Sequence, residues 1–254
     1  TSDKARNVIS GNSSSGILIF NFTAQGNKVL GNFIGTDITG SFGLGNFGGI
    51  RITAAIHNII GGAVDIASGL IPRNVISGNV GNGIEIIGNF SSGNIVQGNY
   101  IGTDNTGMIR LANDDGLLIL GAHDNTIGGL SALTRNVISG NLHNGIEITG
   151  LTSDAIGNNH VQGNFIGVGV DGVTDVGNDE HGILITQSSN NFIGGLESGA
   201  GNIIAFNGFS LKQSGHGVVI ASGTGNLISH NSIFENAGRG IDLGNDSFTL
   251  NDPA

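Results

Sequence analysis

The chain has 254 residues, of which 47 are glycine and none is cysteine, and its formal net charge is −10 with only 9 Lys and Arg. This balance argues against nucleic acid as a partner, because a nucleic-acid binder needs a cationic surface. The lack of cysteine excludes disulfides and metal-thiolate sites, and the lack of any run of eighteen apolar residues predicts no membrane insertion.

Two strings recur along the chain. Arg-Asn-Val-Ile-Ser-Gly-Asn begins at residues 6, 73 and 135, and a diverged copy begins at 201, so the copies start 67, 62 and 66 residues apart. Between them stands Gly-Asn-Phe-Ile-Gly-Thr-Asp at 31–37, its tyrosine variant at 98–104, and a copy without Thr-Asp at 163–168. The sequence therefore has a long internal repeat.

A third element is a glycine followed by alternating aliphatic residues, a pattern that predicts a short strand with one buried face. Its eight copies begin at residues 16, 49, 83, 116, 145, 182, 217 and 240, which are 23 to 37 residues apart. No unit has enough apolar residues to fold alone, so neighbouring units must stack and share one core. We therefore predict an all-β protein: a right-handed, single-stranded parallel β-helix (a solenoid) of about eight rungs with three short sheets.

Asparagine recurs at fixed turn positions, where it tolerates left-handed backbone conformations and can hydrogen-bond along the stack. We expect residues 1–254 to form a single β-helix domain. We also expect this domain to be a fragment of a longer array, with neighbouring repeats of the same chain as its partners.

The Asn-x-Ile-x-x-Asn and Gly-Ile-x-Ile patterns resemble the right-handed parallel β-helix repeats of the pectate-lyase-like superfamily. The Asn-Val-Ile-Ser-Gly-Asn and Gly-Asn-x-Ile-Gly-Thr-Asp strings are similar to tandem repeats of large secreted bacterial surface proteins. The resemblance covers nearly the whole chain and implies the fold and an extracellular or cell-surface location. It implies no particular activity, because this fold carries many functions.

Register places the outward-facing residues of the Gly-Ile-x-Ile strands in columns. The apolar members that we select as candidate binding residues are Phe20, Ile87, Leu118, Leu120 and Leu184. Either the inserted loops fold over this face, or it is a surface for a polysaccharide or another surface partner. Arg51 and Glu85 fall on adjacent rungs, which predicts a surface ion pair.

Titratable residues gather in the turns before these strands. The catalytic candidates are Asp115, Glu147, His181 and His216, and the candidate metal ligands are Asp114, Asp179, Glu180 and His181. Such side chains are typical of glycoside chemistry and of metal sites, respectively. However, Asp115 and His216 are separated by three rungs, about 14 Å, which is far for two groups that act on one sugar.

Asp37 and Asp104 recur at equivalent loop positions. A catalytic residue occurs once whereas a structural residue recurs, so we expect both to close turns, with calcium binding by these loops as the alternative. The sequence names no other cofactor.

Taken together, these patterns favour a non-catalytic structural or adhesive segment of a secreted or cell-surface bacterial protein, with carbohydrate as one ligand it would contact. The alternative is a polysaccharide lyase, glycoside hydrolase or epimerase whose cleft follows the Gly-Ile-x-Ile sheet.

Overall fold

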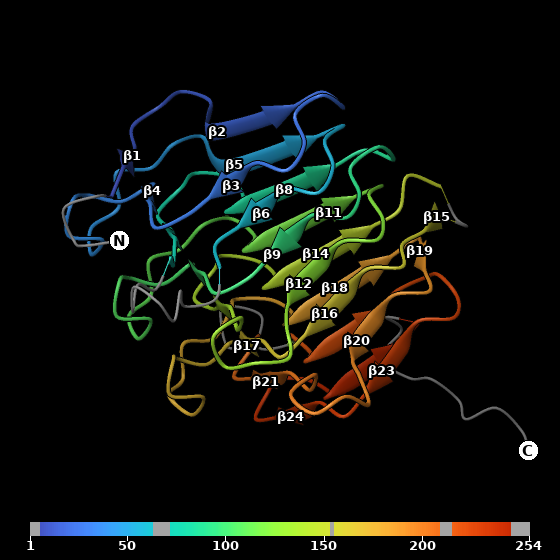
Figure 1. Ribbon diagram of the computed structural model, residues 1–254. Coiled ribbons are helices and arrows are strands. Elements are labelled where there is room, and N and C mark those ends of the chain that lie inside the picture. Colours follow the sequence, from blue (N-terminus) through green and yellow to red (C-terminus); the bar gives the residue numbers. More distant parts are fainter. Residues whose placement is uncertain (1–5, 63–71, 153–154, 209–214, 245–254) are drawn as a thin grey trace, which may run out of the picture.

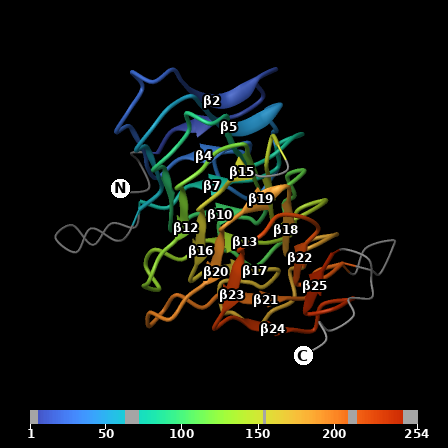
Figure 2. The same ribbon diagram turned by 90° about the vertical axis from the view of Figure 1, so that its right-hand side faces the viewer.

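The computed structural model describes residues 6–62, 72–152, 155–208 and 215–244. All regular elements in these ranges are short strands, and parallel pairing joins them into a solenoid whose turns stack one on another (Figures 1 and 2). No helix in the described ranges is long and apolar enough to cross a membrane. The predicted all-β parallel solenoid is confirmed, and its right-handed sense stays a prediction.

Three sheets follow one another around each turn. Sheet A contains β1 (Val8–Ile9), β4 (Phe33–Ile34), β7 (Val75–Ile76), β10 (Tyr100–Ile101), β13 (Val137–Ile138), β17 (Phe165–Ile166), β21 (Ile203–Ala205) and β24 (Ser232–Phe234). Sheet B contains β2 (Ser15–Phe20), β5 (Gly48–Thr53), β8 (Ile84–Ile87), β11 (Leu117–Leu120), β14 (Ile146–Thr149), β18 (Ile183–Thr186), β22 (Val218–Ile220) and β25 (Ile241–Leu243). Sheet C contains β3 (Lys28–Val29), β6 (Ile59–Ile60), β9 (Ile95–Val96), β12 (Thr126–Gly128), β16 (His160–Gln162), β20 (Phe192–Gly194) and β23 (Leu227–Ser229).

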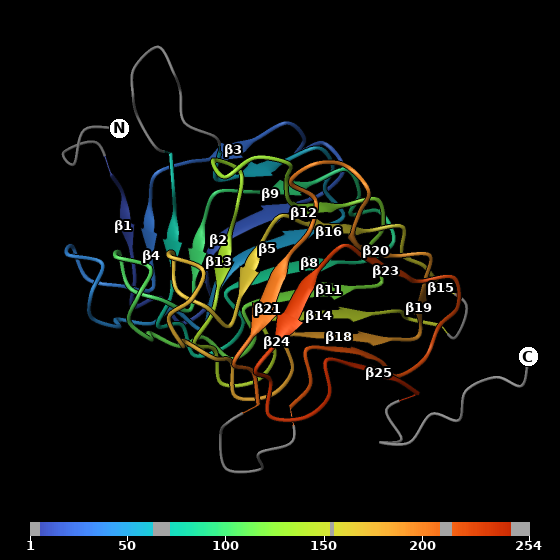
Figure 3. The same cartoon turned by 90° about the horizontal axis from the view of Figure 1, so that it is seen from below.

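A fourth, two-stranded sheet pairs β15 (Ala155–Ile156) with β19 (Ser188–Ser189). Within the described residues, seven turns pass through sheets A, B and C, and the eighth contributes strands to sheets A and B alone. The number of complete turns is thus slightly below the eight rungs that the sequence predicts. Seen from below, the strands of sheet A run across the direction of those of sheet B (Figure 3).

The core is a set of aliphatic columns that run the length of the solenoid. Ile76, Ile86 and Val96, one from each sheet of the same turn, are completely buried. Burial of each such side chain contributes about 1.5–3 kcal/mol, and the residue above or below it in register is again Ile, Val or Leu. The alternation of the Gly-Ile-x-Ile packets therefore points two aliphatic residues inward per strand, as predicted.

Asparagine side chains form a ladder at three corners of the solenoid. The first ladder is Asn7, Asn32, Asn74, Asn99, Asn136, Asn164, Asn202 and Asn231. The second is Asn12, Asn46, Asn79, Asn113, Asn141, Asn178, Asn207 and Asn236. The third is Asn27, Asn58, Asn94, Asn125, Asn159, Asn191 and Asn226.

Each ladder asparagine except the last of its ladder donates from Nδ2 to Oδ1 of the asparagine in the next turn, at 2.7 Å from Asn12 to Asn46, for example. The predicted hydrogen bonding along the stack is confirmed. The left-handed conformation is adopted by residues that directly precede ladder asparagines, such as His57 (φ 57°), Asp124 (φ 55°) and the asparagine Asn158 (φ 49°). The asparagine itself needs its side chain aimed along the axis, so its neighbour makes the turn.

The outer face of sheet A carries a second apolar cluster that includes Phe33, Tyr100 and Phe165. The guanidinium carbons of Arg6, Arg73 and Arg135 lie 3.9, 4.0 and 4.0 Å from the centroids of these three rings, in that order. Each arginine comes from the turn before its ring, so arginine turns and aromatic turns alternate. The two recurring strings are therefore the two halves of one interlocking unit of two turns.

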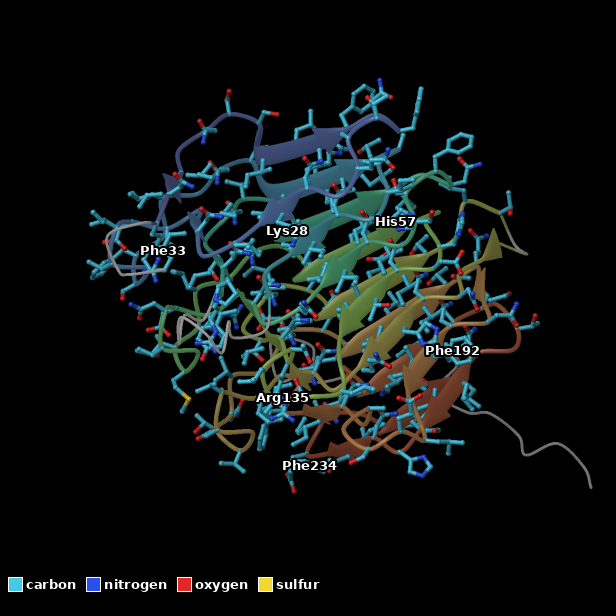
Figure 4. All side chains as sticks on the ribbon, viewed as in Figure 1. Lys28, Phe33, His57, Arg135, Phe192 and Phe234 are labelled. Carbon is cyan, nitrogen blue, oxygen red and sulfur yellow. The ribbon has the colours of Figure 1, made fainter. Side chains whose placement is uncertain are left out.

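Three loops, residues 36–46, 103–113 and 168–178, cover these rings, and we call them the cover loops. A Cβ atom at Gly107 would lie 2.8 Å from Cζ of Tyr100, and Gly107 has a φ of +73°. Gly40 over Phe33 and Gly172 over Phe165 repeat this contact. Phe33 and Arg135 both lie on the side of the molecule where these loops project (Figure 4).

Asp37 and Asp104 hold two of the cover loops in shape. Asp37 Oδ1 accepts hydrogen bonds from the backbone N–H groups of Ser41 and Phe42, and Asp104 Oδ1 accepts one from Ile109. The prediction that these aspartates close turns is confirmed. The expectation that the inserted loops fold over the Gly-Ile-x-Ile sheet is wrong for these loops, since they cover sheet A.

Candidate functional site

The catalytic candidates Asp115, His181 and His216 occupy one corner of the solenoid, where a single glycine separates each of them from the strand that follows, β11, β18 or β22. They belong to a fourth ladder, which we call the mixed ladder. Asp115 Oδ1 accepts a 2.8 Å hydrogen bond from the backbone N–H of Asn144, and Asn144 Oδ1 accepts one of 3.3 Å from His181. The corner thus uses each polar side chain to hold the backbone of the next turn.

The mixed ladder continues through two histidines. His181 Nδ1 accepts a 3.0 Å hydrogen bond from the backbone N–H of His216, and His216 Nδ1 accepts one of 2.7 Å from that of Arg239. The two imidazole rings stack, with centroids 5.4 Å apart and an interplanar angle of 11°. Because Nδ1 accepts in both rings, each neutral ring has its proton on Nε2.

Two of these groups have a shifted pKa. Burial raises the pKa of Asp115 to about 6. The hydrogen bond from the backbone of Asn144 lowers this pKa, and the negative charge of Glu147 raises it further. Burial, together with the positive charge of a protonated His216, lowers the pKa of His181. Both shifts favour the uncharged form of a side chain that serves as a hydrogen-bond acceptor in the ladder.

The burial of Asp242, at the end of this corner, was not predicted from the sequence register. Asp242 is 2% exposed, and its Oδ2 lies 3.2 Å from Nε2 of His216 and 3.7 Å from an Nη atom of Arg239. In register it follows the buried Val219 on the outer face of sheet B, a face whose other members are more exposed. Nothing in the sequence pattern distinguishes this position from those of the outer residues below it.

The remaining carboxylates have separate partners. Glu147 accepts a 2.8 Å hydrogen bond from Thr149 Oγ1, and Leu118 separates it in register from Glu85. Glu85 and Glu147 therefore lie two strands apart, as the sequence repeat predicts, and these two carboxylates do not face each other on adjacent strands.

Three of the four proposed metal ligands have other partners, and one of them, His181, is in the mixed ladder. Asp114 pairs with His143 at 2.7 Å, and Asp179 receives two hydrogen bonds from the guanidinium of Arg110, the longer at 2.6 Å. In the part of the chain that the structure describes, no group of three or more His, Asp or Glu side chains is placed to hold a metal ion.

The outer face of sheet B is where the candidate binding residues come together. Phe20 is 60% exposed, and Ile87, Leu118, Leu120 and Leu184 are half-buried. Leu118 lies in one column with Glu85 and Glu147, and Leu120 lies in the next column with Ile87. The predicted ion pair is present, with Nε of Arg51 3.2 Å from Glu85 Oε2.

The alternation of strand residues did not predict two aromatic residues beside this face. Phe22 is 70% exposed and Phe90 is 68% exposed, in the turns that follow β2 and β8. Turns differ in length from one rung to the next, so alternation cannot assign their side chains to a face. The available signal was composition: each sits in the sequence Asn-Phe-Thr or Asn-Phe-Ser, outside any strand.

Comparison of the chain with protein-family models, with curated proteins and with solved structures found no match. The comparisons therefore give no support for the expected membership of the pectate-lyase-like superfamily, and the site must be interpreted from its own geometry.

Proposed function

We propose that this chain is a non-catalytic structural segment of a secreted or cell-surface bacterial protein, and that it presents the outer face of sheet B as an adhesive surface for carbohydrate. The observation that carries the proposal is the mixed ladder. The side chains of Asp115, His181 and His216 each accept a hydrogen bond from the backbone of the next turn, so three of the four residues that looked catalytic have a structural role. The cover loops lie on sheet A, which leaves the apolar columns of sheet B for a partner.

A binding experiment tests the adhesive role. We expect the intact chain to be retarded in native gels that contain a soluble polysaccharide, and the double variant Leu118→Ser, Leu184→Ser to lose most of that retardation. Leu142→Ser is the matched control, because Leu142 is 48% exposed but lies in the turn before β14 rather than on sheet B. Equal retardation of all three proteins would contradict the proposal.

One observation favours the alternative, a polysaccharide-processing enzyme. A pKa of about 6 for Asp115, with the charge of Glu147 nearby, is in the range of a general acid. The discriminating assay measures turnover of neutral and acidic polysaccharides by the intact chain and by Asp115→Asn and His181→Ala. Turnover that either substitution abolishes establishes the enzyme and removes the structural interpretation.

A further inference from the structure

The mixed ladder uses a different kind of acceptor in its last two steps. In the earlier steps, the backbone N–H of the next turn is accepted by side-chain oxygens, those of Asn82, Asp115 and Asn144. In the last two steps the acceptor is Nδ1 of an imidazole, and the hydrogen bonds measure 3.0 Å from His216 to His181 and 2.7 Å from Arg239 to His216. The earlier acceptors keep a lone pair at mildly acidic pH, whereas a proton can occupy the imidazole acceptors.

Protonation of His181 removes its hydrogen bond to the next turn. A protonated imidazole has an N–H on both ring nitrogens and no acceptor, so its Nδ1–H would face the backbone N–H of His216. This corner is partly buried, and a backbone N–H that loses its acceptor in such a place costs about 1–3 kcal/mol. The closed corner therefore requires the neutral ring of His181.

The charged groups on the loop of His181 and on the turn before it leave the ring neutral. Two ion pairs occupy this region, Asp114–His143 and Asp179–Arg110. The nearby charge of Glu180 raises the pKa of His181, but burial has a larger effect and lowers this pKa. The balance favours the ring that can accept the N–H of His216.

The next two turns supply the other charged groups at this corner. The imidazole of His216 stacks on that of His181, with ring centroids 5.4 Å apart, so a charge on both rings would repel. Asp242 faces the corner as well, but its Oδ2 lies 3.2 Å from Nε2 of His216 and 3.7 Å from an Nη atom of Arg239. This carboxylate therefore joins the seventh turn to the eighth, and the step from the sixth turn to the seventh depends on His181.

The backbone bonds of the same step run in the opposite direction. The N–H groups of Gly182 and Ile183, in the sixth turn, donate to the carbonyl oxygens of His216 and Gly217, each at 2.9 Å. If the segment before β22 moves away, these two N–H groups lose their acceptors together with that of His216. The three amides therefore report on one opening event.

We infer that this step is an acid-sensitive joint: protonation of His181 releases the backbone of His216, and the corner before β22 opens while the earlier turns stay stacked. We define the joint by His181, His216 and the backbone of residues 182–183 and 217. The inference goes beyond the proposed adhesive function and does not depend on whether sheet B binds carbohydrate.

The size of the effect has an upper limit. In the open form His181 has its ordinary pKa of 6.5, whereas in the closed form its pKa is lowered. The contribution of His181 to closure is complete above pH 6.5 and is lost as the pH falls from there through the lowered value. At pH 5 an ordinary imidazole is protonated about thirtyfold more often than it is neutral, so opening can increase by about thirtyfold at most between pH 7.5 and pH 5.

Amide hydrogen–deuterium exchange of the whole chain at pH 7.5 and pH 5, read by mass spectrometry, tests the joint. After correction for the intrinsic pH dependence of exchange, peptides that contain residues 182–183 and 216–217 should exchange about ten- to thirtyfold faster at pH 5. Peptides of β5 are the internal reference and should change by less than about twofold.

His181→Asn should abolish the acceleration, because an asparagine acceptor does not titrate and already holds the equivalent positions 82 and 144. His160→Gln is the matched control and should behave like the parent. His160 is also half-buried and stacks on an aromatic ring, that of Phe192, but it lies in sheet C, away from this corner.

A second measurement needs the parent chain alone. The ¹⁵N chemical shifts of the His181 imidazole at pH 7.5 should show a proton on Nε2 and none on Nδ1. A proton on Nδ1 overturns the inference, as does an equal acceleration of exchange in the parent and in His181→Asn. Acceleration of the same size in β5 also overturns it, in favour of a loss of stability in the whole solenoid.

Discussion

Replacing Asp115 with asparagine is expected to stabilise the protein at neutral pH. The folded pKa of Asp115 is raised from its ordinary value of 3.8 to about 6, so folding favours the protonated carboxyl group. The stability that this preference provides is complete below pH 3.8 and is lost as the pH rises through about 6. At pH 7.5 the carboxylate is charged and buried, at 8% exposure.

The magnitude follows from the size of the shift. About two pKa units at 1.36 kcal/mol per unit correspond to roughly 3 kcal/mol between the charged and the neutral group. Asparagine is uncharged and retains an Oδ1 acceptor for Asn144, and asparagine already occupies the equivalent positions 82 and 144. Allowing for local relaxation of the ionised group, we expect Asp115→Asn to gain about 1–2 kcal/mol at pH 7.5.

Urea denaturation followed by circular dichroism at pH 7.5 and at pH 4.5 measures this gain. Most of it should disappear at pH 4.5, where Asp115 is protonated in the folded protein. The converse variant Asn144→Asp places a second carboxylate beside Asp115 and should destabilise the protein at pH 7.5 and much less at pH 4.5. A gain in Asp115→Asn that is equal at the two pH values, or a loss at pH 7.5, would refute the electrostatic reasoning.

Three further predictions concern the stack itself. Gly107→Ala should lower the free energy of unfolding by about 2–4 kcal/mol, because its φ is +73° and its Cβ would meet Tyr100; an unchanged urea midpoint contradicts the role of the cover loop. Asn136→Ala should cost about 3 kcal/mol, since this buried side chain donates to Asn164 and Val96 and accepts from Asn99; a cost near zero in the same titration would mean that the ladder is dispensable. For His181 the folded pKa is lowered, so its contribution to stability is complete above its ordinary pKa of 6.5 and is lost as the pH falls through the lowered value. Unfolding temperatures from pH 7.5 to 5 should therefore fall less steeply in His181→Asn than in the parent, and identical slopes would refute this assignment.

The fold could be predicted from the sequence because the residues that form the core recur at regular positions in every repeat. Alternating Ile at positions such as 84 and 86 gives the inward face, and like strings at like intervals give parallel stacking. The sequence repeat does not show which side of the molecule an inserted loop covers. It depends on a ring meeting a glycine, as in Phe33 and Gly40, which sequence spacing alone does not reveal.

The candidate site was only partly predictable for a related reason. Column arithmetic correctly placed Arg51 beside Glu85, because both lie in strands with a fixed register. It could not show that Nδ1 of His181 accepts the backbone N–H of His216, since a turn residue can point in several directions. The polar residues that the sequence suggested as catalytic therefore turned out to be hydrogen-bond acceptors of the mixed ladder.

The alternation of arginine turns and aromatic turns bears on how a gene for such a protein can change length. Deleting residues 73–134 would bring Arg135 to the place of Arg73 and leave its stacking on Phe165 intact. Deleting a single turn would instead set two turns of the same kind against each other. During evolution, such a protein should therefore gain and lose turns in pairs. Natural length variants should differ by steps near the 62 to 67 residues that separate the arginine strings here.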